Sequence, residues 1–239
     1  EEMRPAVVSF HFGLPPAQLL SRVRAVGALI LSSATTVAEA RWLEQHGADA
    51  VIAQGREAGG HRAMFLSDDV DAQPGLISLL PQVRDAVRLP VVAAGGISDG
   101  RAIAAAFALG ADAVQIGTGY LRTPEATISP IHRAALASAA DDATRLTNVF
   151  TGRPARGLIN RFVAEVGPMC PDAPPFPLAT GAAAPLRAAA EQRGSREFSP
   201  LWAGESAALA REEGAEALTR RLWTDALAVM SGLSSRWKD

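Results

Sequence analysis

Residues 50–65 read AVIAQGREAGGHRAMF, a short apolar strand that runs into a turn with three glycines and a histidine. A strand that ends in such a turn is typical of parallel α/β folds, which build their sites at strand ends. The backbone at Gly55, Gly59 and Gly60 can approach a ligand closely, because glycine has no side chain and tolerates positive φ. His61 is therefore expected to stand beside the bound ligand.

Apolar strands and helical patterns alternate on both sides of this turn. Strands are predicted at residues 6–10, 29–33, 50–54, 90–94 and 113–116, and helices at about 15–26, 37–46, 76–87 and 101–109. Thr36 is the expected cap of the second helix and Asp99 that of the fourth. Strands that alternate with helices over such a length indicate parallel βα units.

The pattern favours an α/β fold of the (β/α)8 TIM-barrel type over a doubly wound sheet. Glycine follows several strands, and the dinucleotide fingerprint of a doubly wound sheet is absent. A complete barrel has eight strands in about 250 residues, so we expect an incomplete barrel of about five C-terminal βα units. Glu1 and Glu2 precede Met3 and the chain enters a strand almost at once, which fits a missing N-terminal part.

The chain changes in character after the fifth unit. A strand is predicted at residues 146–150, a helix at 154–165 and an amphipathic helix at 206–230, with Trp202 and Trp223 as core anchors. The predicted domains are residues 1–145, the C-terminal portion of a barrel, and residues 146–239, a mostly helical substrate region that packs on it.

Composition limits the possible functions. The 239 residues are 48% apolar and 20% charged, which suits one globular domain with a small subdomain. A formal net charge of -2 gives no reason to expect a nucleic-acid or membrane partner, and no apolar run is long enough to span a membrane. Cys170 is the single cysteine, which excludes an internal disulfide. We expect a soluble, cytoplasmic protein without a metal site.

Three glycine turns follow three consecutive strands: residues 55–60, Gly95 with Gly96, and Gly117 with Gly119. In a barrel all three would lie on the face that carries the active site, where main-chain N–H groups can hold a phosphate. Ordinary strand-to-helix turns would explain any one of them. Together they favour a phosphorylated ligand, without distinguishing flavin mononucleotide (FMN) from a sugar phosphate.

Five segments in this order and spacing resemble the nitronate monooxygenase family, formerly called 2-nitropropane dioxygenases. They are SFHFGLPP (9–16), QGREAGGHR (54–62), PVVAAGGISDG (90–100), QIGT (115–118) and FTGRPARGLINRF (150–162). The resemblance covers essentially the whole chain. It implies a flavin-dependent (β/α)8 barrel with an inserted helical substrate domain.

The resemblance also implies roles for individual residues. His61 corresponds to the catalytic histidine, and His11, at the end of an earlier strand, is expected to face the same cavity. The implied cofactor is FMN, and its expected binding residues are Gln54, Gly55, Gly60, Gly95, Gly96, Gln115, Ile116, Gly117 and Thr118.

The implied reaction is the oxidation of an alkyl nitronate, such as propionate 3-nitronate, by O2 to a carbonyl compound and nitrite. A histidine suits this chemistry, because it can hold an anion by a charge-assisted hydrogen bond or remove the α-proton of a nitroalkane. We expect the protein to act on a small molecule as a monomer or homodimer.

Two other functions fit the same sequence. An FMN-dependent enoyl-[acyl-carrier-protein] reductase, or a related NAD(P)H:quinone reductase, carries a similar EAGGH turn. An inactive barrel fragment is the third possibility, since the residues that face the turn from the first barrel strands are expected to be missing. Ala63 also departs from the glycine that is usual in the family.

Overall fold

The computed structural model describes residues 2–236, with side chains up to residue 233. The chain forms two compact units that interleave along the sequence. The first unit contains the residues up to Arg56, Ala63–Gly95 and Ala104–Gln115; the second contains Glu57–Arg62, Gly96–Ile103 and the chain from Ile116 onward. The expected division into a barrel portion at residues 1–145 and a substrate region at residues 146–239 stays a prediction.

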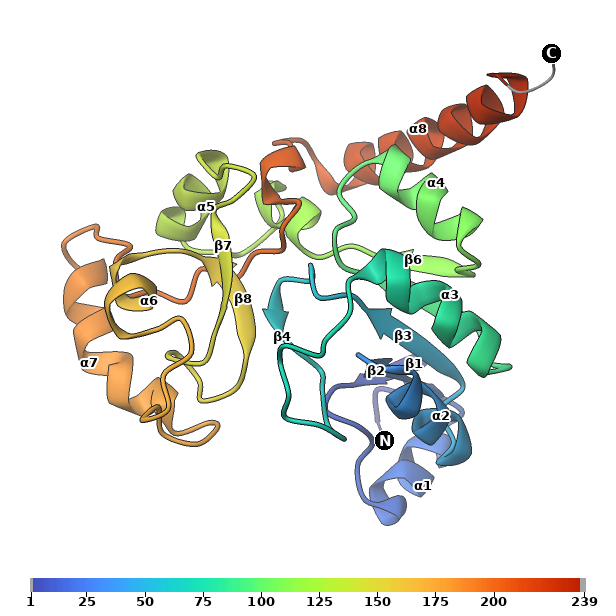
Figure 1. Ribbon diagram of the computed structural model, residues 1–239, viewed down its shortest axis with the longest axis horizontal. Coiled ribbons are helices and arrows are strands. Elements are labelled where there is room, and N and C mark those ends of the chain that lie inside the picture. Colours follow the sequence, from blue (N-terminus) through green and yellow to red (C-terminus); the bar gives the residue numbers. More distant parts are fainter. Residues whose placement is uncertain (1, 237–239) are drawn as a thin grey trace. The chain divides into compact units, whose positions relative to one another are not determined.

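The first unit is built on a parallel five-stranded sheet with the order β1-β2-β3-β5-β6 (Figure 1). Its strands are β1 (Val7–Phe10), β2 (Leu29–Ala34), β3 (Ala50–Gln54), β5 (Val91–Ala94) and β6 (Ala113–Gln115), and its connecting helices are α1 (Ala17–Ala25), α2 (Val37–Gln45), α3 (Leu76–Ala86) and the second half of α4 (Gly100–Ala108). The predicted α/β class and the order of these elements are confirmed.

Local sequence explains where these elements begin and end. The Thr36 hydroxyl accepts the Glu39 N–H at 3.2 Å and so starts α2. Every residue of β3 is buried, as expected for a central parallel strand, whereas β1 and β6 at the two edges of the sheet are largely exposed.

A buried carboxylate ties α2 to the segment that follows His61 in the sequence. Glu39 is fully buried, and one oxygen accepts the N–H and hydroxyl of Thr35, both at 2.7 Å. The other oxygen accepts the N–H groups of Phe65 at 2.6 Å and Leu66 at 3.1 Å. These bonds compensate for the burial of the carboxylate and hold residues 65–66 against α2.

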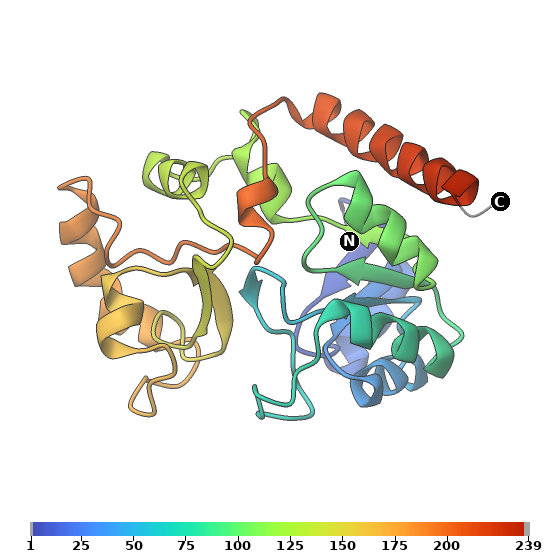
Figure 2. The ribbon, with the colours of Figure 1, turned by 45° about the horizontal axis from the view of Figure 1, so that its top comes forward.

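The second unit contains a small antiparallel sheet with the order β4-β8-β7 (Figure 2). Its strands are β4 (Gly60–His61), β7 (Thr144–Thr147) and β8 (Ala155–Leu158). The remaining elements are the 3-10 helices η1 (Thr118–Arg122) and η2 (Ala207–Leu209) and the helices α5 (Pro130–Ala137), α6 (Arg161–Val166), α7 (Ala179–Glu191) and α8 (Ala215–Arg236), besides the start of α4.

Several expectations for this region are wrong. The helix expected at 154–165 is strand β8 followed by the short helix α6, which begins at Arg161 because the Asn160 side chain caps it by accepting the Val163 N–H. The strand expected at 146–150 begins two residues earlier and ends three residues earlier, and the helix expected from residue 206 begins only at Ala215. Strands β4 and β8 are 90 or more residues apart in the sequence, so no local pattern marks their pairing.

Of the two tryptophans expected as core anchors, Trp202 packs against a buried cluster and Trp223 differs from expectation. Trp202 is half-buried and packs against Phe150, with ring centroids 5.7 Å apart. Trp223 on α8 is 52% exposed, whereas Leu218, Leu222 and Ala226 of the same helix are buried. Trp223 is therefore not a core anchor. Over residues 2–236, the structure contains no helix with the length and hydropathy of a membrane span.

Candidate active site

Pairing with β8 positions His61. Within the second unit, Gly60 lies opposite Arg156 and His61 opposite Ala155, and the N–H of Arg62 donates to the carbonyl of Pro154 at 2.8 Å. The sequence predicts that His61 lies on a turn after a strand. In the structure, this turn ends in the two-residue strand β4, which contains His61. The backbone of His61 is thus held by a sheet rather than left on a free loop.

The imidazole ring of His61 is half-buried and contacts Thr151, Phe176 and Trp202. Its Nε2 lies 2.9 Å from the hydroxyl of Thr151. Its ring meets Phe176 edge-on and Trp202 at a tilt, with centroids 5.6 Å away in both cases. Neither Thr151 nor Phe176 is predicted as a site residue from the sequence; the signal that could mark Thr151 is its place in the FTGRPAR segment.

We define residues 55–61 as the His61 turn. Segment 201–205 packs against residues 57–59 of this turn. The N–H of Glu205 donates to the Glu57 carbonyl at 3.0 Å, and a Cβ on Gly59 would lie 2.5 Å from the Gly204 nitrogen. Gly59 is therefore required for a close approach of two backbones. Gly60 has φ +74° and open space around it, so its conformation, not its surroundings, requires glycine.

In the first unit, three strands end at the same level. Gln54 of β3 lies opposite Ala94 of β5, which lies opposite Gln115 of β6, and Gly55 and Gly95 directly follow. The Gln54 side chain is 7% exposed, and its oxygen accepts the Ala63 N–H at 2.9 Å. Gln54 thus helps to close the base of the turn.

The remaining predicted turn residues lie in the second unit. Gly96 has φ +70°, and a Cβ there would touch the Glu57 side chain at 3.4 Å. Gly117 precedes η1, and the Thr118 hydroxyl accepts the Gly204 N–H at 2.9 Å. Binding of a cofactor by Gly96, Ile116, Gly117 and Thr118 stays a prediction.

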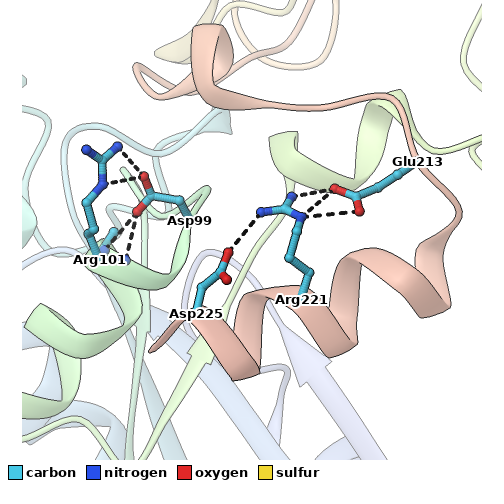
Figure 3. A network of polar contacts seen from close by, with 6 residues as sticks. Asp99, Arg101, Glu213, Arg221 and Asp225 are labelled. Atoms are coloured by element: carbon cyan, nitrogen blue, oxygen red, sulfur yellow. Dashed lines mark hydrogen bonds and ion pairs between the residues drawn. The ribbon is translucent and has the colours of Figure 1, made fainter. Parts of the chain in front are cut away.

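The start of α4 is already capped by a side chain of the protein. Asp99 accepts the N–H groups of Arg101 at 2.9 Å and Ala102 at 3.1 Å, and also binds the Arg101 guanidinium (Figure 3). Burial raises the pKa of Asp99, but the hydrogen bonds and charge of Arg101 and the Ala102 N–H outweigh it and leave the pKa below its ordinary value. A negative charge therefore already occupies this helix end.

His11 belongs to the first unit. It directly follows β1 and is exposed, and its ring meets Phe12 edge-on at 4.6 Å. Its catalytic role stays a prediction. In residues 2–236, no three or more His, Cys, Asp or Glu side chains are grouped so as to hold a metal ion.

Most of the sequence of this chain matches one protein family. A family model described as nitronate monooxygenase matches residues 1–225. The nitronate monooxygenase of Pseudomonas aeruginosa is 47% identical over 92% of this chain and 63% of its own length, and that of Paraburkholderia phytofirmans is 43% identical over 92% and 61%. The chain thus spans less than two thirds of these relatives.

Solved structures of two other proteins are similar to this chain. A nitroalkane oxidase from Streptomyces ansochromogenes is 48% identical with a TM-score of 0.88, over 95% of this chain and 65% of that one. FabK from Thermotoga maritima is 28% identical with a TM-score of 0.79, over 98% of this chain and 72% of that one. The chain belongs to the nitronate monooxygenase family.

Proposed function

We propose that the protein oxidises alkyl nitronates, such as propionate 3-nitronate, with FMN and O2, and forms a carbonyl compound and nitrite. One observation carries the proposal: the imidazole of His61 is half-buried, held at Nε2 by Thr151 and flanked by Phe176 and Trp202. Family membership and the similarity to a nitroalkane oxidase support it.

His61 suits both tasks that such a substrate sets. A protonated imidazole binds an anionic nitronate through a charge-assisted hydrogen bond. A neutral imidazole can accept the α-proton of a nitroalkane, since the ordinary pKa of histidine lies near neutral pH. Phe176 and Trp202 place apolar rings beside the imidazole, which strengthens its electrostatic interactions by excluding water.

We assign FMN to the residues that the family resemblance implies: Gln54, Gly55, Gly60, Gly95, Gly96, Gln115, Ile116, Gly117 and Thr118. A Cβ on Gly60 or Gly117 would meet nothing within 4 Å, so the backbone there leaves room for a bound group. Thr118 accepts the Gly204 N–H, so its own hydroxyl proton can go to a phosphate oxygen. Bound FMN would supply the electron transfer.

We propose that the FMN phosphate binds to the glycine turns and not to the N-terminus of α4. The amides of Arg101 and Ala102 already bind Asp99, and the Asp99 carboxylate would repel a phosphate at the same position. Main-chain N–H groups of the glycine turns 95–96 and 117–119 are the donors that we propose instead.

We further propose that the parallel sheet is part of a (β/α)8 barrel. The five strands β1, β2, β3, β5 and β6 are parallel and joined by helices, as in five consecutive βα units of such a barrel. Residues 1–145 would supply this portion and residues 146–239 the substrate region.

Nitrite release tests the function. The chain, incubated with FMN, O2 and propionate 3-nitronate but no nicotinamide, is expected to produce nitrite. His61→Asn should lower kcat/KM by about 100-fold or more, the usual contribution of a positioned acid or base. The matched control is His46→Asn, at an exposed histidine that follows α2, which should leave the rate unchanged.

Other outcomes would favour the rival functions. Consumption of NADH with an enoyl thioester, without nitrite release, would indicate the reductase. A purified chain that stays colourless after incubation with FMN would indicate a fragment without cofactor binding.

A further inference from the structure

We infer that Thr151 is a positioning residue for His61: its hydroxyl fixes the imidazole ring and stabilises the protonated form. This inference rests on the proposed function, in which His61 binds the substrate. Thr151 lies in the second unit with His61, and its Oγ1 is 2.9 Å from Nε2. The two residues are 90 positions apart in the sequence, and β4–β8 pairing brings the segments together.

The Thr151 hydroxyl has a second set of partners in its own turn. It lies 3.2 Å from the Arg153 carbonyl, to which it can donate, and 3.4 Å from the Arg153 N–H, from which it accepts. A hydroxyl has one proton and two lone pairs. When its proton goes to the Arg153 carbonyl, the oxygen is available to accept from Nε2–H of His61.

This arrangement favours the imidazolium. Nε2 of a protonated histidine must donate, and Thr151 can accept that bond while its own proton stays on the Arg153 carbonyl. A hydrogen bond from a charged donor is stronger than the bond that the neutral ring makes. Rotation of the hydroxyl alone therefore adapts the contact to either protonation state, with more stabilisation of the charged one.

Two charged groups on the neighbouring segments have contacts of their own. Arg153 places its guanidinium 6.0 Å from the centroid of the Phe176 ring, and Arg156, opposite Gly60, is paired with Glu205 at 2.9 Å. The same segments also carry Glu57 and Arg62. The Thr151 hydroxyl, 2.9 Å from Nε2, is the polar contact on which the inference rests.

Two aromatic rings restrict how His61 can turn. Phe176 presents its edge at 80° and Trp202 lies at 50° to the imidazole. A ring in contact with both is restrained in an orientation that directs Nε2 at Thr151.

The test compares Thr151→Val, which removes the hydroxyl at nearly constant shape, with Thr151→Ser, which keeps it. The pKa of the His61 ring is measured by NMR in the full chain, with His61→Asn to assign its signals. We expect Thr151→Val to lower this pKa by roughly 0.5–1 unit, from the difference between charged and neutral hydrogen bonds. Thr151→Ser should restore it.

Thr180→Val is the matched control, since the Thr180 hydroxyl donates to the Phe150 carbonyl at 3.1 Å in the same unit. It should leave the His61 pKa unchanged. In nitrite release, the pH at which kcat/KM falls on the alkaline side should move down with Thr151→Val. An unchanged His61 pKa in folded Thr151→Val would overturn the inference. If the wild-type chain releases no nitrite, the proposed function fails, but the NMR comparison still decides the role of Thr151.

Discussion

Two adjacent glycines in the His61 turn are needed for different physical reasons. Gly59 faces the backbone of segment 201–205, where a Cβ would lie 2.5 Å from the Gly204 nitrogen and 2.6 Å from the Ala203 carbonyl carbon. Gly60 has nothing within 4 Å of a Cβ but a φ of +74°. At Gly59, contact with a neighbouring backbone excludes a side chain. At Gly60, the backbone conformation excludes one.

Gly59→Ala is expected to lower the free energy of unfolding by about 1–3 kcal/mol, the usual cost of overpacking, because backbone atoms must move. Gly60→Ala should cost about 1–2 kcal/mol through left-handed strain alone. Chemical denaturation measures both. Gly181→Ala, in helix α7 with open space around it, is the control and should be neutral or stabilising. A Gly59→Ala variant as stable as the wild type would refute the close approach.

His132 predicts a dependence of stability on pH. Burial lowers its pKa below the ordinary value of 6.5, and the hydrogen bond from Nε2 to the Trp202 carbonyl, at 3.0 Å, offsets this only in part. A lowered pKa means that the unfolded chain binds a proton more readily than the folded one. His132 therefore contributes stability above pH 6.5 that is lost as the pH falls through its lower, folded-state pKa.

Unfolding measured between about pH 7.5 and about pH 5 checks this prediction. His132→Gln should reduce the loss of stability on acidification, because the buried titrating group is gone. His46→Gln, at an exposed position stacked on Trp42, should keep the wild-type dependence. Equal pH dependence in all three proteins would contradict a role for burial of His132.

On helix α8, the contribution of a side chain to stability depends on whether it faces the core or the solvent. The middle of α8 packs closely on the first residue of α4, since a Cβ on Gly100 would lie 2.5 Å from the Ala226 nitrogen. Arg221 forms ion pairs with Glu213 and Asp225 (Figure 3), and the Arg221 hydrogen bond lowers the pKa of Glu213. These groups are partly exposed, so the apolar contacts carry more of the stability.

Leu222→Ala should destabilise the protein by about 2–4 kcal/mol, because Leu222 is 3% exposed. Trp223→Ala, one position further on α8, should cost less than about 1 kcal/mol, since Trp223 is 52% exposed. Thermal and denaturant unfolding would compare the two variants. The opposite order would show that Trp223 is an anchor of the core after all.

The whole molecule consists of two units, and each unit is made of several separate segments of the sequence. Residues 57–62 and 96–103 belong to the second unit although the first unit surrounds them in the sequence. Strand β4 comes from the earlier of these segments and pairs with β8. The second unit therefore depends on residues that lie far before its main part.

A fragment of residues 116–239 is thus expected not to fold. It lacks β4, which pairs with β8, and residues 57–59, on which segment 201–205 packs. We expect poor dispersion in its NMR spectrum and weak circular dichroism, beside a folded full-length chain. A well-dispersed spectrum of the fragment would show that β4 is dispensable.

Much of the first unit was predictable because its signals are local. The buried strand at 50–54, the Thr36 cap and the glycine turns after three of the strands are set by neighbours in the sequence, and the observed bounds differ from the predicted ones by at most two residues. The segment from 154 onward was misjudged, because β8 exists through its pairing with β7 and β4.

For the candidate site, the sequence by itself determined the family resemblance and singled out His61 with its glycine turn, since these depend on residue types and spacing. Only the tertiary structure decided that Thr151, Phe176 and Trp202 surround the imidazole, and that Gly59 serves packing. The physical reason is sequence distance: contacts across 90 or more residues arise from strand pairing and backbone packing, which no local pattern records.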